Sequence, residues 1–260
     1  MRAAFRQLDE LLRGVKTDPG RLIAGETNLR LRIFVPLAVA LGAAYGFFMG
    51  WFAVLGHTPP NYQQLLASTL KIPALFLLTL LITFPSLYVF NALLGCRLRF
   101  HATLQLLLGA IVVNLAVAAS FGAILGFFTL STTSYSFMVL LNVALLGIAG
   151  AVGLGFLLRV LRRVAFWQAE EDAAAARIPA IDTNTGELRP LTTARASDPL
   201  GPANYIFRVW ILIYALVGAQ MGWILRPFIG APHVPFTWFR PRSGNFFQAV
   251  IGAVESLLKS

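Results

Sequence analysis

The charged residues of this chain stand almost entirely between long apolar runs, and this distribution limits the folds that are open to it. Five apolar segments are each long enough to cross a bilayer, which takes roughly 20 helical residues. No Asp, Glu, Lys or Arg stands in the middle of any of them. The segments cover residues 31–55, 70–95, 102–130, 137–159 and 207–226. We therefore predict an all-α fold, a polytopic transmembrane helical bundle with five spans and an amphipathic interfacial helix at each end.

The composition agrees with a single membrane bundle. Mean hydropathy is +0.72, which is above the range of ordinary soluble domains. The formal net charge is +10, but the basic residues flank apolar spans, so a membrane surface explains them better than nucleic acid does. The predicted parts are a cytoplasmic amphipathic segment (1–30), a four-span bundle (31–160), a cytoplasmic helix extension with a Pro-rich loop (161–206), a fifth span (207–226) and an exterior aromatic segment with an amphipathic helix (227–260).

The connections between spans alternate in charge. The segment before the first span and the connection after the fourth are rich in Arg, the second connection carries Arg97 and Arg99, and the first and third carry no charge. Because basic loops stay in the cytoplasm, we expect a cytoplasmic N-terminus, an exterior C-terminus and a place in a bacterial inner membrane. Basic residues after the last span, among them Arg226 and Arg240, disagree with this. The alternative is a fifth segment that re-enters and returns to the cytoplasm.

The N-terminal segment predicts an amphipathic helix over residues 2–16. Phe5, Leu8 and Leu12 fall on one face of it, with charged residues elsewhere. Such a basic helix suits the surface of an anionic membrane. The alternative is a helix that packs under the bundle.

The C-terminal segment predicts a second interfacial element. Trp238 belongs to an aromatic stretch with interleaved prolines, which suits the headgroup region. Asn245 or Ser243 can cap the helix that follows, whose apolar face begins with Phe246 and Phe247. We expect this helix to lie flat in the outer interface.

The fourth span predicts a helix that continues into the cytoplasm. The sequence RVLRRVAFWQAEEDAAAAR after it has high helix propensity, and Pro179 ends it. Residues 178–204 contain four prolines and no apolar periodicity, which predicts a loop.

Small residues recur four apart in several spans, which places them on one helix face and lets helix backbones approach closely. We expect these residues to pack the bundle, and the alternative is that one stripe faces a neighbouring protomer. The predicted packing glycines are Gly42, Gly46, Gly50, Gly122, Gly126, Gly147, Gly155, Gly218 and Gly222.

Polar residues away from the ends of the predicted spans are few, and none is an Asp, Glu, Lys or Arg. Thr79, Thr83, Asn114 and Gln220 are the main ones. Asn114 sits near mid-depth and is expected to form an interhelical hydrogen bond, with a pore-lining role as the alternative. The absence of intramembrane charge speaks against a proton relay or coupled transport. No metal, cofactor or catalytic motif is found in the sequence, so we expect neither a cofactor nor an enzyme.

The hydropathy profile, together with the stretches LKIPALFLLTLLITFPSLYVFNALLG and FMVLLNVALLGIAGAVGLG, resembles the bacterial branch of the Yip family of five-span membrane proteins. The resemblance covers roughly residues 8–226 and implies membrane organisation or partner binding. The family's eukaryotic DLYGP motif is not found in the sequence, so no Rab-type GTPase partner is implied.

Two functional classes follow from the sequence. The first is a non-catalytic membrane-organising scaffold or accessory subunit, with membrane lipids and a protein partner or further copies of the chain as its contacts. The second is a passive channel or small-solute carrier with a path near Asn114 and Pro85. The absence of internal charge favours the first.

Overall fold

The computed structural model describes residues 2–13, 20, 31–56, 59–93, 100–176, 201–226, 228–231, 234–240 and 244–259. Within these residues the chain is helical and contains no strand. The helices are α1 (Arg2–Leu12), α3 (Leu31–Gly56), α4 (Tyr62–Leu93), α5 (Phe100–Ser131), α6 (Tyr135–Ala176), α7 (Gly201–Leu225) and α8 (Phe246–Lys259). The prediction of an all-α fold is confirmed for the described residues.

Four stretches of helix are long and apolar enough to cross a membrane. They are Leu31–Gly56, Tyr62–Ser86, Phe100–Ser131 and Tyr135–Gln168. The apolar part of α7 that can be assessed, Ile211–Leu225, is shorter. The structure is therefore compatible with an integral membrane protein that has at least these four spans.

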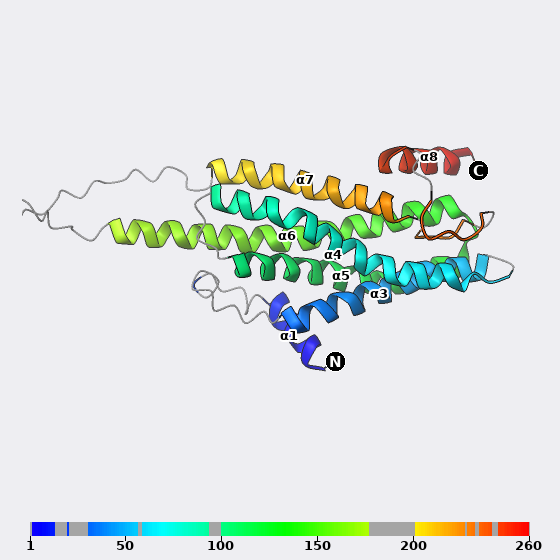
Figure 1. Cartoon of the computed structure of the whole chain (residues 1–260), viewed down its shortest axis with the longest axis horizontal. Coiled ribbons are helices and arrows are strands. Elements are labelled where there is room, and N and C mark those ends of the chain that lie inside the picture. The colour runs from blue at the N-terminus through cyan, green and yellow to red at the C-terminus, as the bar shows by residue number, and fades with distance from the viewer. Residues whose placement is uncertain are drawn as a thin grey trace, which may run out of the picture.

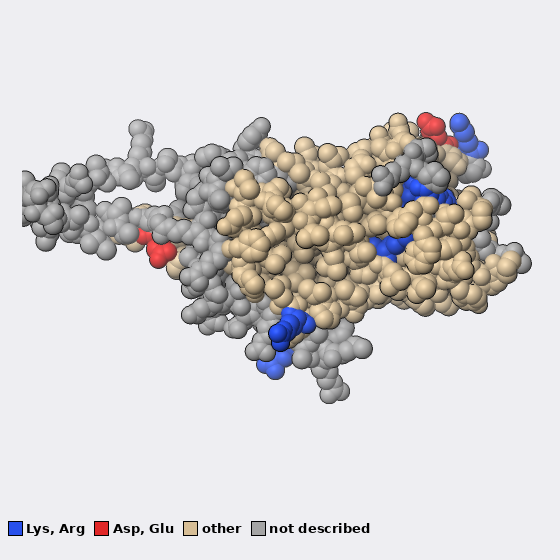
Figure 2. Space-filling model, viewed as in Figure 1, with Lys and Arg blue, Asp and Glu red and all other residues tan. Residues whose placement is uncertain are grey.

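Helices α3 to α7 run along the long axis of the molecule, and α8 lies beside one end of the bundle (Figure 1). Helix α3 packs on α4 and α5, α5 packs on α6, and α4 packs on α7. Helix α5 carries buried residues all along its length, from Ala102 to Thr129. A helix that is apolar on all sides belongs in the centre of a bundle. Figure 2 shows a long band of this face on which the described residues carry no Lys, Arg, Asp or Glu.

The closest helix contact joins α3 to α4 and uses three predicted glycines. A Cβ on Gly42 would lie 3.1 Å from Cα of Pro73, and a Cβ on Gly50 would lie 2.8 Å from Cα of Leu65. A Cβ on Gly46 would collide with the carbonyl oxygen of Ser68. At Gly46 and Gly50 a Cβ would come within 3.0 Å of the backbone of α4, so only glycine permits this approach, and at Gly42 a Cβ would be tight; the predicted close packing is present here.

The second span begins earlier than the sequence analysis placed it. Residues 62–69, predicted as part of a loop, form the first two turns of α4. Asn61 caps this helix, because its Oδ1 accepts a hydrogen bond from the backbone N–H of Gln64 at 3.0 Å. Lys71, which stood at the edge of the predicted span, consequently lies well inside the candidate span Tyr62–Ser86. The expectation that charged residues stand only at the ends of spans is wrong at this position.

The N-terminal helix packs against the bundle. Helix α1 ends at Leu12, four residues short of the predicted end, and contacts α3 and α5. Leu8 and Leu11 are buried, and the Leu11 side chain lies 3.6 Å from the Cβ position of Gly109 in α5. Leu8 is thus a core residue, and its assignment to the lipid interface is corrected. Leu12 is exposed, and the Phe5 side chain lies outside the described residues.

Helix α6 confirms the predicted extension. It runs without a break from Tyr135 to Ala176, over 42 residues, and so carries the fourth span beyond the apolar bundle. Such a helix is about 63 Å long at 1.5 Å per residue. The predicted loop at residues 178–204 lies outside the described residues except for its last four, which begin α7.

Helix α8 runs alongside α6 and α7 (Figure 1). That it lies flat in the outer membrane interface stays a prediction. Asn245 and Gln248 form a reciprocal capping box: each side-chain oxygen accepts a hydrogen bond from the other residue's backbone N–H at 3.0 Å. The predicted cap at Asn245 is therefore confirmed. The small residues Ala249 and Ala253 are half-buried on the inner face, and side chains of this size allow close packing.

Candidate ligand-binding site

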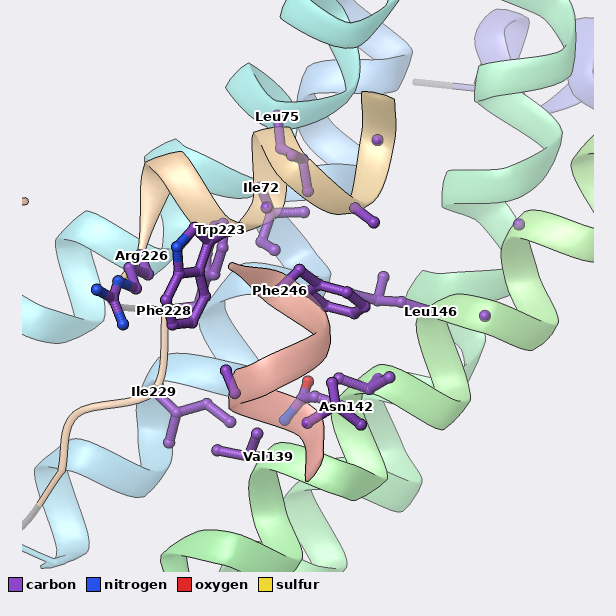
Figure 3. A pocket seen from close by; sticks show the side chains of 18 of the residues that line it. Ile72, Leu75, Val139, Asn142, Leu146, Trp223, Arg226, Phe228, Ile229 and Phe246 are labelled. Atoms are coloured by element: carbon purple, nitrogen blue, oxygen red, sulfur yellow. The ribbon is translucent and has the colours of Figure 1, made fainter. Parts of the chain in front are cut away.

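A cavity of about 860 Å³ lies between α4, α6, α7 and α8. This volume is in the range of about 300–1,000 Å³ that is typical of ligand pockets. Its walls are mostly aliphatic and aromatic, and none of the described residues that line it is acidic. Figure 3 labels Ile72, Leu75, Val139, Asn142, Leu146, Trp223, Arg226, Phe228, Ile229 and Phe246 around it.

Helix α8 forms one wall of the cavity. Phe246, Ala249, Val250 and Ala253 line the interior, and Phe246 reaches across it towards Leu146 (Figure 3). The Ser136 hydroxyl donates a hydrogen bond to the Ser256 hydroxyl at 3.0 Å, which ties α8 to the start of α6. The wall therefore depends on a helix that has few buried contacts of its own, since none of its residues is fully buried.

The opposite side of α8 is apolar and exposed. Phe247, Ile251, Val254 and Leu258 follow one another at spacings of four, three and four residues, and Leu258 is 82% exposed. The prediction of an interfacial role stays open for Phe247. Phe246, which was predicted to share this face, instead points into the cavity (Figure 3).

The segment between α7 and α8 is held on α4 by three buried polar side chains. Gln64, Ser68 and Lys71 are spaced four and three residues apart, so they share one face of α4. Gln64 Nε2 donates to the carbonyl oxygen of Phe228 at 3.0 Å, and the Ser68 hydroxyl donates to the same oxygen. Lys71 Nζ donates to the carbonyl oxygen of Trp238.

These contacts change the interpretation of the aromatic segment. Ile229 is buried, whereas Trp238 and Phe239 remain exposed by 48% and 60%. The segment is therefore anchored to the protein through its backbone, and its aromatic rings remain on the surface, where the predicted headgroup contact of Trp238 stays open.

Two basic side chains, Arg226 and Arg240, line one rim of the cavity, and a third, Lys71, stands directly before the lining residue Ile72 on α4. The guanidinium of Arg226 lies 3.5 Å from the centre of the Trp223 ring, a cation–π contact that fixes its position. Lys71 Nζ lies 5.1 Å from the centre of the Phe239 ring. Nε of Arg240 is buried and has no hydrogen-bond partner.

Two amides, Asn114 and Asn142, line the cavity. Asn142 accepts a hydrogen bond from the Tyr45 hydroxyl at 2.9 Å and donates one to the carbonyl oxygen of Met138 at 2.9 Å. Asn114 is buried, and its Oδ1 has no hydrogen-bond partner. The interhelical hydrogen bond predicted for Asn114 is therefore absent at Oδ1. Tyr45 and Asn142 form such a bond instead.

Asn114 faces two glycines that the sequence analysis did not select. A Cβ on Gly153 would lie 2.7 Å from Cβ of Asn114, and one on Gly150 would lie 3.9 Å from Nδ2. Because Gly150 and Gly153 on α6 carry no side chain, there is room for the Asn114 amide of α5. The signal was present in the sequence, since both glycines fall in the small-residue run of the fourth span.

The remaining predicted packing glycines divide into two groups. Phe48 fills the space beside Gly122 and Gly126, its ring atoms lying 2.5 Å and 3.2 Å from their Cβ positions, and Gly218 lies 3.9 Å from Thr79 Cγ2. Gly147, Gly155 and Gly222 have no atom within 4 Å of a Cβ position among the described residues. No packing contact within the chain is therefore seen for these three, and Gly147 and Gly222 line the cavity. The alternative that small residues face a neighbouring protomer stays a prediction.

Two of the other predicted polar residues form hydrogen bonds within their own helix. Thr79 and Thr83 are buried, and each hydroxyl donates to the carbonyl oxygen four residues earlier, at 2.8 Å and 2.7 Å. Thr79 also lines the cavity. Gln220 is half-buried on α7 and does not line it.

The basic rim escaped the sequence analysis for an identifiable reason. Arg226 and Arg240 were counted only as basic residues after the last span, and Lys71 was not considered. The three come together because the backbone carbonyl oxygens of Phe228 and Trp238, which follow α7, accept hydrogen bonds from α4. In the part of the chain that the structure describes, no group of three His, Cys, Asp or Glu side chains is arranged to hold a metal ion.

Comparison with protein-family models, curated proteins and solved structures found no match for this chain.

Proposed function

We propose that this chain is a non-catalytic integral membrane protein that holds an amphiphilic lipid in the cavity between α4, α6, α7 and α8. The observation that carries the proposal is the cavity itself, with its apolar walls, a volume of about 860 Å³ and a basic rim. An apolar pocket with a few polar groups at one end suits a ligand that is itself apolar with one polar end.

The shape of the lining favours a binding site over a channel. On α6 the lining residues run from Tyr135 to Leu154, and on α4 from Ile72 to Thr79. Pro85, the second marker of the pore path considered above, does not line the cavity. The cavity therefore occupies one part of the bundle and does not extend along the whole of α4 or α6.

A lipid-holding protein of this kind is an accessory subunit or a carrier of lipid, and we keep the membrane-organising scaffold as a second candidate. The observation that favours a scaffold is the exposed apolar stripe of α8, Phe247, Ile251, Val254 and Leu258, which a protein partner or a second copy of the chain can cover.

We further propose a five-span topology, with α7 as the fifth span and the N-terminus in the cytoplasm. Helix α7 has 25 residues, a length of about 37 Å at 1.5 Å per residue, which is enough for the hydrocarbon core. Membership of the bacterial Yip branch remains a proposal that rests on the hydropathy resemblance alone.

Glycines that border open space provide a direct test of the cavity. Gly147→Leu and Gly222→Leu would each place a side chain in the cavity, at a Cβ position with no atom within 4 Å among the described residues. Gly155→Leu is the matched control, because its Cβ position is equally open but Gly155 does not line the cavity. Retained and added diacyl lipid are measured by native mass spectrometry of the full-length protein in mild detergent.

The expected result is a clear loss of bound lipid in the two cavity variants, with wild-type binding in the control and similar melting temperatures for all. Wild-type lipid binding by well-folded Gly147→Leu and Gly222→Leu proteins would refute a ligand in this cavity. The scaffold candidate is tested separately by Leu258→Gln, which should release a partner or dissociate an oligomer if the α8 stripe is covered by protein.

A further inference from the structure

Asn114 lines the cavity with a polar side chain that the bundle leaves unsatisfied. It is 5% exposed, and its Oδ1 accepts no hydrogen bond from the described residues. Thr79, Ser136 and Asn142 also line the cavity, but each has a hydrogen-bond partner within the chain. A buried acceptor without a donor is unfavourable, and more so in hydrocarbon, where water is scarce. Asn114 therefore calls for a donor from outside the bundle.

The amide of Asn114 faces a part of α6 that carries no side chains. Nδ2 lies 3.9 Å from the Cβ position of Gly150, and Cβ lies 2.7 Å from the Cβ position of Gly153. Gly150 and Asn114 both line the cavity. An amide can rotate by half a turn about its last bond, which exchanges the positions of Oδ1 and Nδ2. A hydroxyl group both donates and accepts, so it can pair with this amide in either orientation.

Asn114 lies at the end of the cavity opposite Arg226. Together with Leu154 and Tyr214 it also lines a small adjoining pocket. Among the residues that line the main cavity, Leu154 is the last on α6 and Tyr214 is the first on α7. From Tyr214 to Arg226, directly after α7, the distance is about 18 Å at 1.5 Å per residue. A lipid whose headgroup lies at the rim therefore meets Asn114 well along its acyl chain.

We propose that the lipid held in this cavity carries a hydroxyl group on its acyl chain, and that this hydroxyl forms a hydrogen bond with Asn114. The inference rests on the proposed function and adds the chemical class of the ligand. A plain acyl chain would fill the apolar space but leave the amide unpaired. A short polar molecule would pair with the amide but leave the rest of the cavity empty. A chain with a hydroxyl group in its second half does both.

The test compares two lipids that differ only in a chain hydroxyl. Full-length protein in mild detergent is titrated with dioleoyl phosphatidylcholine and with diricinoleoyl phosphatidylcholine, whose chains are oleoyl chains with one hydroxyl group in the second half. Bound lipid is measured by native mass spectrometry. Oleyl alcohol is the third ligand, because a free long-chain alcohol presents a hydroxyl group without a phosphate headgroup.

The variants change the amide of Asn114 and one matched hydroxyl. Asn114→Leu keeps the branched shape of the side chain and removes its polar atoms, and Asn114→Ala removes them with a smaller side chain. Thr79→Val is the control, because Thr79 lines the same cavity but its hydroxyl already donates to the carbonyl oxygen of Leu75 at 2.8 Å. Melting temperatures in the same detergent show which variants are folded.

The expected result is that the wild type binds the hydroxylated lipid about fivefold more tightly than the plain one, the size of one hydrogen bond. Asn114→Leu and Asn114→Ala should remove this preference while their binding of dioleoyl phosphatidylcholine stays close to that of the wild type. Thr79→Val should keep the preference, because the hydroxyl that it lacks is already paired within α4.

Two outcomes would overturn the assignment. The first is equal affinity of the wild type for the two phosphatidylcholines, which would mean that water satisfies Asn114, or a free alcohol if oleyl alcohol binding depends on Asn114. The second is a preference for the hydroxylated lipid that survives in a folded Asn114 variant. In both cases the lipid-holding function stands and only the chain hydroxyl fails, whereas absence of binding by both phosphatidylcholines removes the proposed function as well.

Discussion

The Tyr45 hydroxyl donates a hydrogen bond to Oδ1 of Asn142 at 2.9 Å and so joins α3 to α6 through the interior of the bundle. Both residues are buried, and the Asn142 amide donates in turn to the carbonyl oxygen of Met138. This hydrogen bond joins two polar groups in an otherwise apolar region, so its removal should lower the stability of the protein.

Tyr45→Phe should destabilise the protein by about 1 kcal/mol, the size of an interhelical hydrogen bond in a membrane protein. The ring is kept, so the loss reflects the hydroxyl and the unsatisfied Asn142 oxygen. Unfolding of the detergent-solubilised protein measures it. Tyr62→Phe is the control, because Tyr62 is 66% exposed. Equal stability of the Tyr45→Phe and wild-type proteins would show that this hydrogen bond contributes nothing.

Gly46→Leu should destabilise the protein by about 3 kcal/mol or prevent folding, because the new side chain would meet the backbone of α4 at Ser68. Gly155→Leu makes the same chemical change at a position with no atom within 4 Å, and should leave stability near that of the wild type. Melting profiles of the two variants in one detergent give the comparison. Similar profiles would mean that α3 and α4 are not in close contact at Gly46.

Ser68→Ala should loosen the segment that folds back onto α4. It removes a donor to the carbonyl oxygen of Phe228, which leaves Gln64 as the remaining partner shown for that oxygen. Amide hydrogen exchange in residues 228–231 should accelerate by about tenfold if the contact is worth about 1.4 kcal/mol. The control is Thr69→Ala, whose hydroxyl donates only to Leu65 of its own helix in the contacts shown. Unchanged exchange in Ser68→Ala would contradict the anchoring role.

The five-span topology predicts that the third connection and the loop after α6 lie on opposite sides of the membrane. The variants Ser134→Cys and Ser197→Cys each carry a single cysteine, because the native Cys96 is replaced by serine in both. The two cysteines should react with an impermeant reagent from opposite faces. Labelling of both from the same face would show that an even number of spans lies between Ser134 and Ser197, which would contradict the proposed topology.

Deletion of residues 244–260 should abolish lipid retention while leaving the rest of the bundle folded. Helix α8 supplies Phe246, Ala249, Val250 and Ala253 to the cavity wall, and none of its residues belongs to the buried core. Native mass spectrometry of the truncated protein gives both the bound lipid and the oligomeric state. Dissociation to a smaller species would show that the α8 stripe is an oligomer contact. Full lipid retention would contradict the role of α8 as a wall.

The sequence by itself determined the parts of the fold that depend on local composition. Apolar runs of spanning length predicted the long helices, because a helix in an apolar surrounding must satisfy its backbone internally. The extension of α6 to Ala176 followed from helix propensity, and the cap at Asn245 followed from its side-chain chemistry. The four-residue spacing of Gly42, Gly46 and Gly50 correctly predicted one close helix contact.

Spacing did not determine which small residues pack. Gly147 and Gly222 fit the same pattern as Gly46 but border the cavity, because the pattern records the absence of a side chain and not the identity of its neighbour. The same holds for Asn114, which is buried but has no hydrogen-bond partner at Oδ1, whereas an interhelical hydrogen bond forms at Asn142, where Tyr45 on α3 is within reach.

Only the tertiary structure decided the candidate site. Lys71 stands far from Arg226 and Arg240 in the sequence. The two arginines were counted only as basic residues after the last span, and Lys71 was not considered. They meet because backbone carbonyl oxygens of Phe228 and Trp238 find donors on one face of α4, which turns the segment after α7 back along the bundle. The donors and acceptors of this contact are separated by about 160 residues, and such long-range pairing leaves no periodic trace in either segment.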